Sequence, residues 1–296
     1  MNFTAVKTLF LFFMFLINFH AFAWNAPLSL INRMTGSGSA VSNENSGLLT
    51  HLAPYQCPIS TLEVNHNNFS FDKIDLIDQT KLRDPDLPAE FDWRDFNGVT
   101  PVKNQGSFQS CWAFSGIAAL EHMIKIEDGI EENLSEQDLI NWNTSHGGGN
   151  GAILSRAGDY FKLLGATYAK NEPYQAHDGI IQLSHPRAYK IIDGGDFFGE
   201  DREAMKYCVY HFGALMTMID GNLLLQNYTG GIFNLKSNTI NHDVLIVGWN
   251  DNQGYWIIKN SWGTGLGENG YFRIAYGAAC IGAVNYAMVY KDLLLN

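Results

Sequence analysis

Cys111 is the residue of this sequence best placed for nucleophilic chemistry, because it stands directly before a run of apolar residues with helical spacing. The run extends to Ile124, and Asp128 followed by Gly129 is a typical helix end. Unpaired N–H groups and the positive end of the helix dipole favour a thiolate at a helix N-terminus, and the thiolate is the nucleophilic form of cysteine. Taken alone, a cysteine is more often a buried structural residue or half of a disulfide.

A thiol nucleophile needs a base within hydrogen-bond reach, a group that orients the base, and donors for the developing oxyanion. His242 opens a segment that predicts a strand over 242–248, and Asn260 directly follows a predicted strand over 254–259. One such residue alone is usually just a satisfied polar group. Together with Cys111, however, they supply a candidate nucleophile, base and orienting group, with the latter two at strand ends.

The elements that must position these residues divide the chain into a helical part and a strand-rich part. Helical patterns follow Cys111 and recur over 134–140 and 154–164. From about Ala214 onward the sequence predicts strands, at 243–249, 255–259, 271–276 and 285–290. This division predicts an α+β protein with two lobes, and a cleft between two lobes is a usual place for a substrate site.

Residues 1–23 have the features of a secretory signal peptide. Lys7 supplies the positive charge, Leu9 to Ile17 form an unbroken apolar core, and residues 21–23 form a small-x-small cleavage signal. The apolar core is shorter than the roughly 20 residues that span a bilayer, and no later stretch is long and apolar enough. We therefore expect a mature chain without a membrane span, secreted or periplasmic, or in a lysosome-like compartment of a eukaryote.

A domain boundary is predicted near residue 86, where Pro85 and Pro88 exclude regular structure. Residues 24–86 are rich in Asn, Ser and Gly and show weak periodicity, so they form an N-terminal extension. Residues 87–296 then form one domain.

Composition excludes several classes of function. The 296 residues carry a net charge of −11 without basic clusters, which argues against nucleic acid or anionic lipid as partner. Four cysteines are too few for a disulfide scaffold of this size. The chain has no metal-binding motif of the C-x-x-C or H-E-x-x-H kind. The glycines at 265, 267 and 270 match a dinucleotide loop but precede a strand pattern, so we assign them to turns.

The segment 87–296 resembles the papain family of cysteine proteases. The motifs that carry the resemblance follow one another in the family's order: Leu87 to Arg94, Val99 to Gly106, Ser110 to Ser115, Leu134 to Gln137, Asn241 with His242, Lys259 to Gly263, and Gly267 to Tyr271. His242 also lies within the roughly 130–150 residues expected downstream of such a cysteine. The resemblance implies the papain-like two-lobed fold, with a helical left lobe, a β-barrel-like right lobe and the active site in the cleft between them.

The same resemblance assigns roles to five residues. It implies that Cys111 is the nucleophile, His242 its ion-pair partner and general acid, and Asn260 the group that orients the imidazole. Trp262 would shield the His–Asn bond from water, and Gln105 would donate to the oxyanion beside the backbone N–H of Cys111. The implied protein is a monomeric endopeptidase that acts on polypeptide substrates without a cofactor and is made as a zymogen.

Substrate preference follows only coarsely from the resemblance. P2 denotes the substrate residue two positions before the scissile bond. The family positions that line the P2 subsite match Ala152, Ile153, Leu154, Met218, Ile240 and Asp243 of this sequence. An apolar P2 residue is therefore expected. Asp243 stands where the family has a small apolar residue, and we hypothesise that its carboxylate extends acceptance to Arg or Lys. A carboxylate that merely faces solvent is the alternative.

Several positions depart from the family pattern. Phe108 and Trp142 stand where the family has disulfide-bonded cysteines, so we expect them to fill that volume with apolar packing. Cys280 corresponds to one end of a third bridge, for which the sequence shows no obvious partner. Gln109 and Ala152 replace glycines near the nucleophile, and Leu266 stands where a tryptophan is common. The added side chains would narrow the cleft.

The extension 24–86 occupies the place of an inhibitory propeptide but lacks a long helical pattern. It could block the cleft as an extended chain, serve as a spacer, or remain as a binding extension. Two other functions stay open for the whole chain. One is a catalytically weak or inactive peptide-binding protein on the same fold. The other is a Cys-His acyl transferase or peptide ligase, because fold and triad do not fix the acceptor.

Overall fold

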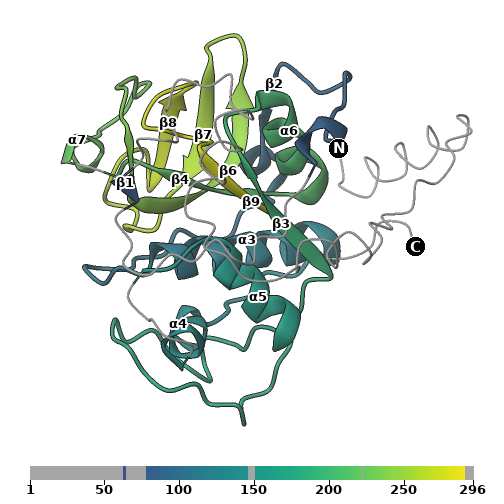
Figure 1. The fold of residues 1–296 in the computed structure, drawn as a ribbon, viewed down its shortest axis with the longest axis vertical. Coiled ribbons are helices and arrows are strands. Elements are labelled where there is room, and N and C mark those ends of the chain that lie inside the picture. Colours follow the sequence, from purple (N-terminus) through teal and green to yellow (C-terminus); the bar gives the residue numbers. More distant parts are fainter. Residues whose placement is uncertain (1–62, 65–77, 146–150, 222, 291–296) are drawn as a thin grey trace, which may run out of the picture. The chain divides into compact units, whose positions relative to one another are not determined.

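The computed structural model describes residues 63–64, 78–145, 151–221 and 223–290, which are the coloured parts of Figure 1. The predicted signal peptide, Cys57 and most of the predicted extension lie outside these residues. Within the described part of the chain, no helix is long and apolar enough to cross a membrane.

An antiparallel sheet organises the strand-rich part of the domain. Its order is β3-β9-β4-β6-β7-β8, and β2 pairs with β6 off this path. The bounds are β2 Glu90–Asp92, β3 Asp193–Phe198, β4 Leu215–Ile219, β6 His242–Asn250, β7 Tyr255–Lys259, β8 Tyr271–Ala275 and β9 Val284–Val289. All nine residues of β6 are buried, as are all five of β7. This burial on both faces explains the apolar runs Val244–Val247 and Tyr255–Ile258 within them, and the four predicted strands are confirmed.

Three helices cover the other part of the domain: α3 Cys111–Asp128, α4 Glu136–Ser145 and α5 Ser155–Leu163. The predicted helix after Cys111 is confirmed, and it ends where expected. Gly129 adopts a left-handed conformation (φ 70°) and donates its N–H to the carbonyl of Lys125, which is a common helix end. Gly116 lets α3 approach α5 closely, because a Cβ there would lie 2.5 Å from that of Ala157.

Shorter elements complete the described chain. They are β1 Glu63–Val64, β5 Thr239–Ile240, α6 Arg202–Tyr207, α7 Leu223–Gln226, the 3-10 helices η3 Gln79–Lys81 and η4 Trp93–Phe96, and the π-helix η5 Cys208–Phe212. Figure 1 shows α3, α4 and α5 gathered apart from β4, β6, β7 and β8, with α3 nearest to the strands. The predicted α+β class is therefore confirmed.

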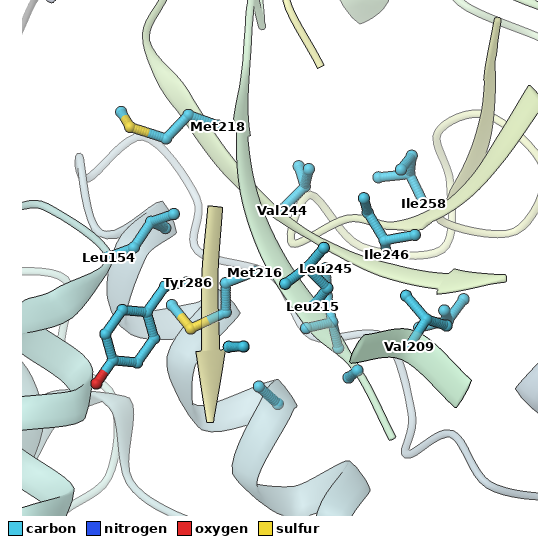
Figure 2. Packing of buried hydrophobic residues seen from close by; sticks show 14 of the residues in the cluster. Leu154, Val209, Leu215, Met216, Met218, Val244, Leu245, Ile246, Ile258 and Tyr286 are labelled. Atoms are coloured by element: carbon cyan, nitrogen blue, oxygen red, sulfur yellow. The ribbon is translucent and has the colours of Figure 1, made fainter. Parts of the chain in front are cut away.

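One apolar core joins the helices to the sheet. Figure 2 shows Leu154, beside α5, together with Met216 and Met218 of β4 and Tyr286 of β9. These side chains are at most 3% exposed. The core is thus continuous from the helical part to the strands, which holds the N-terminus of α3 and the strand ends in a fixed relation.

The positions that depart from the family's disulfide pattern are packed with apolar side chains, as predicted. Trp142 is buried and lies 5.8 Å from the ring of Tyr160, and Phe108 packs against the core. The hydroxyl of Tyr160 donates to the buried carboxylate of Asp138, which also forms an ion pair with Arg187. Packing and a buried ion pair therefore occupy this region.

The described cysteines differ in state. Cys111 and Cys208 are free, whereas Cys280 is disulfide-bonded. Burial raises the pKa of the Cys208 thiol far above its ordinary value. An inert, apolar role follows for Cys208, and it makes this residue a useful control for the chemistry of Cys111.

Candidate active site

Cys111 is the first residue of α3 and is 4% exposed. The backbone N–H groups of Ala113 and Phe114 both donate to the carbonyl of Ser110, so the first turn is well formed at the nucleophile. One turn later, the hydroxyl of Ser115 donates to the carbonyl of Val244 at 3.0 Å. This bond ties the start of α3 to the strand β6, which begins with His242.

His242 is held from two sides. Its Nε2 lies 2.7 Å from Oδ1 of Asn260, and the ring of Trp262 stacks on the imidazole with centroids 4.3 Å apart. Because an amide oxygen only accepts, Nε2 carries the proton in this bond. Nδ1 is then the nitrogen at which a proton can be exchanged. The structure thus brings His242 together with Asn260 and Trp262, which belong to a separate motif of the sequence.

The segment that follows β4 leaves little room around His242. A Cβ built at Gly221 would lie 2.6 Å from that of His242, and the N–H of Gly221 donates to Oδ1 of Asn241 at 2.7 Å. Only glycine fits against the imidazole at this point. Sequence reasoning missed Gly221, because nothing in its local pattern shows that the two segments touch.

The amide of Gln105 is oriented by its neighbours. Its Oε1 accepts from the hydroxyl of Ser261 at 2.6 Å, and its Nε2 donates to the carbonyl of Phe108 at 3.0 Å. Tyr174 donates its hydroxyl to the carbonyl of Gln105 at 2.7 Å. The donor end of the amide therefore lies on the side of the Cys111 loop, as an oxyanion donor requires. Ser261 lies inside a motif that the sequence showed, whereas Tyr174 carried no such signal.

Asp243 is 1% exposed, and its Oδ2 lies 3.6 Å from Sγ of Cys111. The alternative of a solvent-facing carboxylate is therefore wrong: β6 is buried along its whole length, and α3 packs on it. Burial raises the pKa of Asp243 to about 8, against the opposing hydrogen bond from Cys111. The carboxyl is mostly uncharged at neutral pH in this environment.

Burial also raises the pKa of Cys111 well above its ordinary value, and the neighbouring Asp243 raises it further. The position at a helix N-terminus, which favours the thiolate, is outweighed here by desolvation. An ion pair with His242 must offset that effect when the site reacts.

The predicted substrate-binding residues fall into two groups. Leu154, Met218 and Ile240 are fully buried, and Met218 is the cross-strand partner of Asp243. Leu154 and Met218 belong to one apolar cluster (Figure 2). Ala152 and Ile153 are half-buried on the loop before α5. That loop lies beside the nucleophile, because Gly151 donates its N–H to the carbonyl of Gln109 at 3.0 Å.

A short piece of the predicted extension contacts the site region. The strand β1 pairs in parallel with β5, with Glu63 opposite Thr239 and Val64 opposite Ile240. β5 ends two residues before His242. Backbone from the extension therefore lies along the chain that leads to the candidate base. Among the described residues, no group of acidic, histidine or cysteine side chains could hold a metal ion.

Comparison with known proteins identifies the family. The model of the papain family of cysteine proteases matches residues 87–291. This chain belongs to the papain family. The match covers well over half of the chain and begins at residue 87, where the predicted domain begins.

Papain-family relatives are similar to about two thirds of this chain. A senescence-specific cysteine protease of Arabidopsis thaliana is 37% identical over 195 residues, which are 64% of this chain and 56% of that protein. Fruit bromelain from Ananas comosus is 36% identical over 199 residues, 65% of this chain and 56% of that protein. This chain thus spans somewhat more than half the length of these relatives.

Solved papain-family structures share the fold. The bromelain protease from Ananas comosus, in an inhibitor complex, matches with a TM-score of 0.62 and 31% identity, over 69% of this chain and all of that one. Digestive procathepsin L2 from Tenebrio molitor matches with a TM-score of 0.64 and 33% identity, over 69% of this chain and 68% of that one. The papain-like fold expected from the sequence is therefore confirmed.

Proposed function

We propose that this chain is a cysteine endopeptidase in which Cys111, His242 and Asn260 form the catalytic triad. The observation that carries the proposal is the imidazole of His242, held by Asn260 at 2.7 Å and stacked on Trp262. A strand that served only for packing has no need of a buried imidazole fixed in one orientation.

The proposed reaction gives Cys111, His242 and Gln105 a step each. Nδ1 of His242 takes the thiol proton of Cys111, and the thiolate attacks the carbonyl carbon of the peptide bond. Nε2 of Gln105 and the backbone N–H of Cys111 stabilise the oxyanion. The imidazolium then protonates the leaving amine, which departs and leaves a thioester. Water, deprotonated by His242, hydrolyses the thioester and restores the thiol.

Secretion as a zymogen is the second part of the proposal. Residues 1–23 direct export, and residues 24–86 act as an autoinhibitor that is removed on activation. The pairing of β1 with β5 beside His242 supports this role. The solved neighbours also include a procathepsin and a stem bromelain precursor, which are zymogen forms of related proteases. We propose that the mature domain acts as a monomer.

We propose that the domain prefers an apolar residue at P2. Leu154, Met218 and Ile240 are apolar, and Met218 pairs across the sheet with Asp243, the neighbour of Cys111, which supports this preference. Ala152 and Ile153 would bound the subsite on the α5 side. The hypothesis that Asp243 also accepts Arg or Lys at P2 requires an ionised carboxyl, and its environment opposes ionisation below a pH of about 8.

The surroundings of Cys111 are the observation that favours the alternative of a peptide-binding protein. Buried Cys111 has an acidic neighbour that disfavours the thiolate whenever its carboxyl is ionised, which a weak or inactive enzyme would tolerate. An acyl transferase would use the same triad with a different acceptor. The three functions differ in what happens to a thiol-directed probe and to an amide substrate.

The test compares the full chain with a chain that begins at residue 87. We expect the shorter chain to react at Cys111 with a peptide epoxide and to hydrolyse a dipeptidyl fluorogenic amide under reducing, mildly acidic conditions. The full chain should react more slowly until residues 24–86 are removed. Absence of labelling would support the peptide-binding protein, and labelling without hydrolysis would support the transferase.

A further inference from the structure

The carboxyl of Asp243 contacts the candidate nucleophile directly, which the peptidase chemistry does not require. Oδ2 of Asp243 lies 3.6 Å from Sγ of Cys111, and both residues are buried. The other oxygen, Oδ1, has no hydrogen-bond partner among the described residues. A buried carboxylate with one contact and one unpartnered oxygen is costly if charged, so the favoured form is the protonated acid.

The contact is fixed by the fold. Ser115 ties α3 to Val244, the residue after Asp243, at 3.0 Å. Across the sheet, Asp243 faces Met218 of β4 in an antiparallel register. Rotation of the carboxyl away from Cys111 would therefore place it among buried apolar side chains.

Few charged or titratable groups face the carboxyl from the elements packed around it. α3 contributes Cys111, and the neighbour on β6 is His242. The β4 residues next to Met218 in this register are Thr217 and Ile219, and β5 contributes Ile240; none of them titrates. The described part of the chain thus offers no lysine or arginine that stabilises a charge on Asp243, and only burial and Cys111 act on its pKa.

We propose that Asp243 is a catalytic residue that shares one proton with Cys111, and that loss of this proton closes the alkaline side of the activity range. The proposal rests on the proposed peptidase function. In the active form, the acid donates its proton in a hydrogen bond to the thiolate, while His242 is the imidazolium. When Asp243 ionises, the bond has no proton, and a second negative charge lies beside Sγ. The thiolate then recaptures a proton from His242, and the ion pair is lost.

Activity should depend on pH through the protonation of both Asp243 and His242. The active form needs Asp243 protonated, so activity falls as the pH rises through its pKa of about 8. His242 must also be protonated, and its deprotonation contributes to the same limb. Two required protons make the limb steeper than the roughly tenfold per pH unit that one proton gives.

The test uses the full chain after removal of residues 24–86 by processing, and measures kcat/KM for a dipeptidyl amide from acid to alkaline pH. Three forms are compared: the unaltered protein, Asp243→Asn and Asp243→Ala. On the alkaline side, we expect kcat/KM of both variants to fall less steeply with pH than that of the unaltered protein. One pH unit above the midpoint of the unaltered protein's alkaline limb, each variant should retain a fraction of its maximal kcat/KM that is about tenfold or more larger. On the acid side of the profile, kcat/KM of the variants should stay within about twofold of that of the unaltered protein, because an uncharged acid is replaced by an uncharged group.

A matched control removes an exposed carboxylate, in Asp178→Asn, and should leave the whole profile unchanged. Identical alkaline limbs in the unaltered protein and both Asp243 variants would overturn the proposal. A shift of the acid limb to lower pH in Asp243→Asn would also overturn it, since it would show that Asp243 is charged in the active form.

A second measurement does not depend on turnover. The fraction of Cys111 thiolate is followed by its ultraviolet absorbance and by its alkylation rate with iodoacetamide. In the unaltered protein, the low-pH thiolate should decline as Asp243 ionises, and Asp243→Asn should abolish that decline. If the protein cleaves no peptide but its thiolate declines in this way, the proposed peptidase function is wrong and the proton shared by Asp243 and Cys111 is supported. If it cleaves peptides without it, the shared proton fails alone.

Discussion

The two halves of the candidate site differ in how they are built. On the sheet side, the amide of Asn260 and the ring of Trp262 orient His242. On the helix side, Cys111 lies beside an acid, and the loop before it carries Phe108 and Gln109. The candidate base thus has the neighbours that the family resemblance implies, whereas the candidate nucleophile lies beside residues that depart from the family pattern. The contacts of His242 can thus be kept while a neighbouring carboxyl alters the electrostatic surroundings of Cys111.

The strongest test of the helix side removes the thiol itself. Cys111→Ala should lower kcat by at least about 10⁴-fold, because no other group can form the thioester. Turnover of a dipeptidyl amide measures the effect. Cys208→Ala is the matched control, since Cys208 is also free and buried; it should retain kcat and lose only some thermal stability. Equal losses in both variants would contradict the assignment.

The oxyanion donor gives the next largest effect. Gln105→Ala should lower kcat by about 10²–10³-fold with little change in KM, because the bond strengthens in the transition state. Gln105→Ala also removes the hydrogen bond from the hydroxyl of Ser261 to the Gln105 amide. Ser261→Ala is therefore the control, because it removes this hydrogen bond and keeps the amide. If Ser261→Ala is as damaging as Gln105→Ala, the amide acts structurally and not on the oxyanion.

On the sheet side, Asn260→Ala should lower kcat by about 10²-fold, because the imidazole of His242 loses the partner that orients it. Steady-state kinetics on the processed chain measure the loss. Asn234→Ala, at an exposed position, should be neutral. A variant at Asn260 with unchanged kcat would show that Trp262 and packing suffice to hold His242, and the contrast between the two halves would then disappear.

A single methyl group tests how tightly His242 is held. In Gly221→Ala the new Cβ would lie 2.6 Å from that of His242, so the ring must shift, and we expect about a tenfold loss in kcat. Gly265→Ala is the matched control, because its Cβ would meet nothing within 4 Å. Comparable kcat values for the two variants would mean that the base tolerates displacement.

The sequence predicted the elements well because their signals are local. The apolar spacing after Cys111 and the glycine at 129 define α3, and the continuous apolar runs define β6 and β7. The order of short motifs then pointed to the family, and the family match confirms it. Buried aromatic packing at Trp142 was also foreseen, since a vacated disulfide site must be filled.

What the sequence could not show depends on contacts between distant segments. The direction of the Asp243 carboxyl is set by the packing of α3 on β6, more than 100 residues apart in sequence, so its burial was not foreseen. The contacts of Gly221 with His242 and of Tyr174 with Gln105 are of the same kind. The pairing of β1 with β5 involves only two residues on each side, too few for a periodic signal.

The most direct test of the peptidase assignment is to map the adduct of a peptide epoxide by mass spectrometry on the processed chain and to measure amide hydrolysis in the same sample. The assignment predicts one adduct, on Cys111 and not on Cys208, and loss of hydrolysis in proportion to labelling. Hydrolysis that persists after Cys111 is fully labelled would contradict it, as would an unlabelled Cys111 in a folded chain freed of residues 24–86.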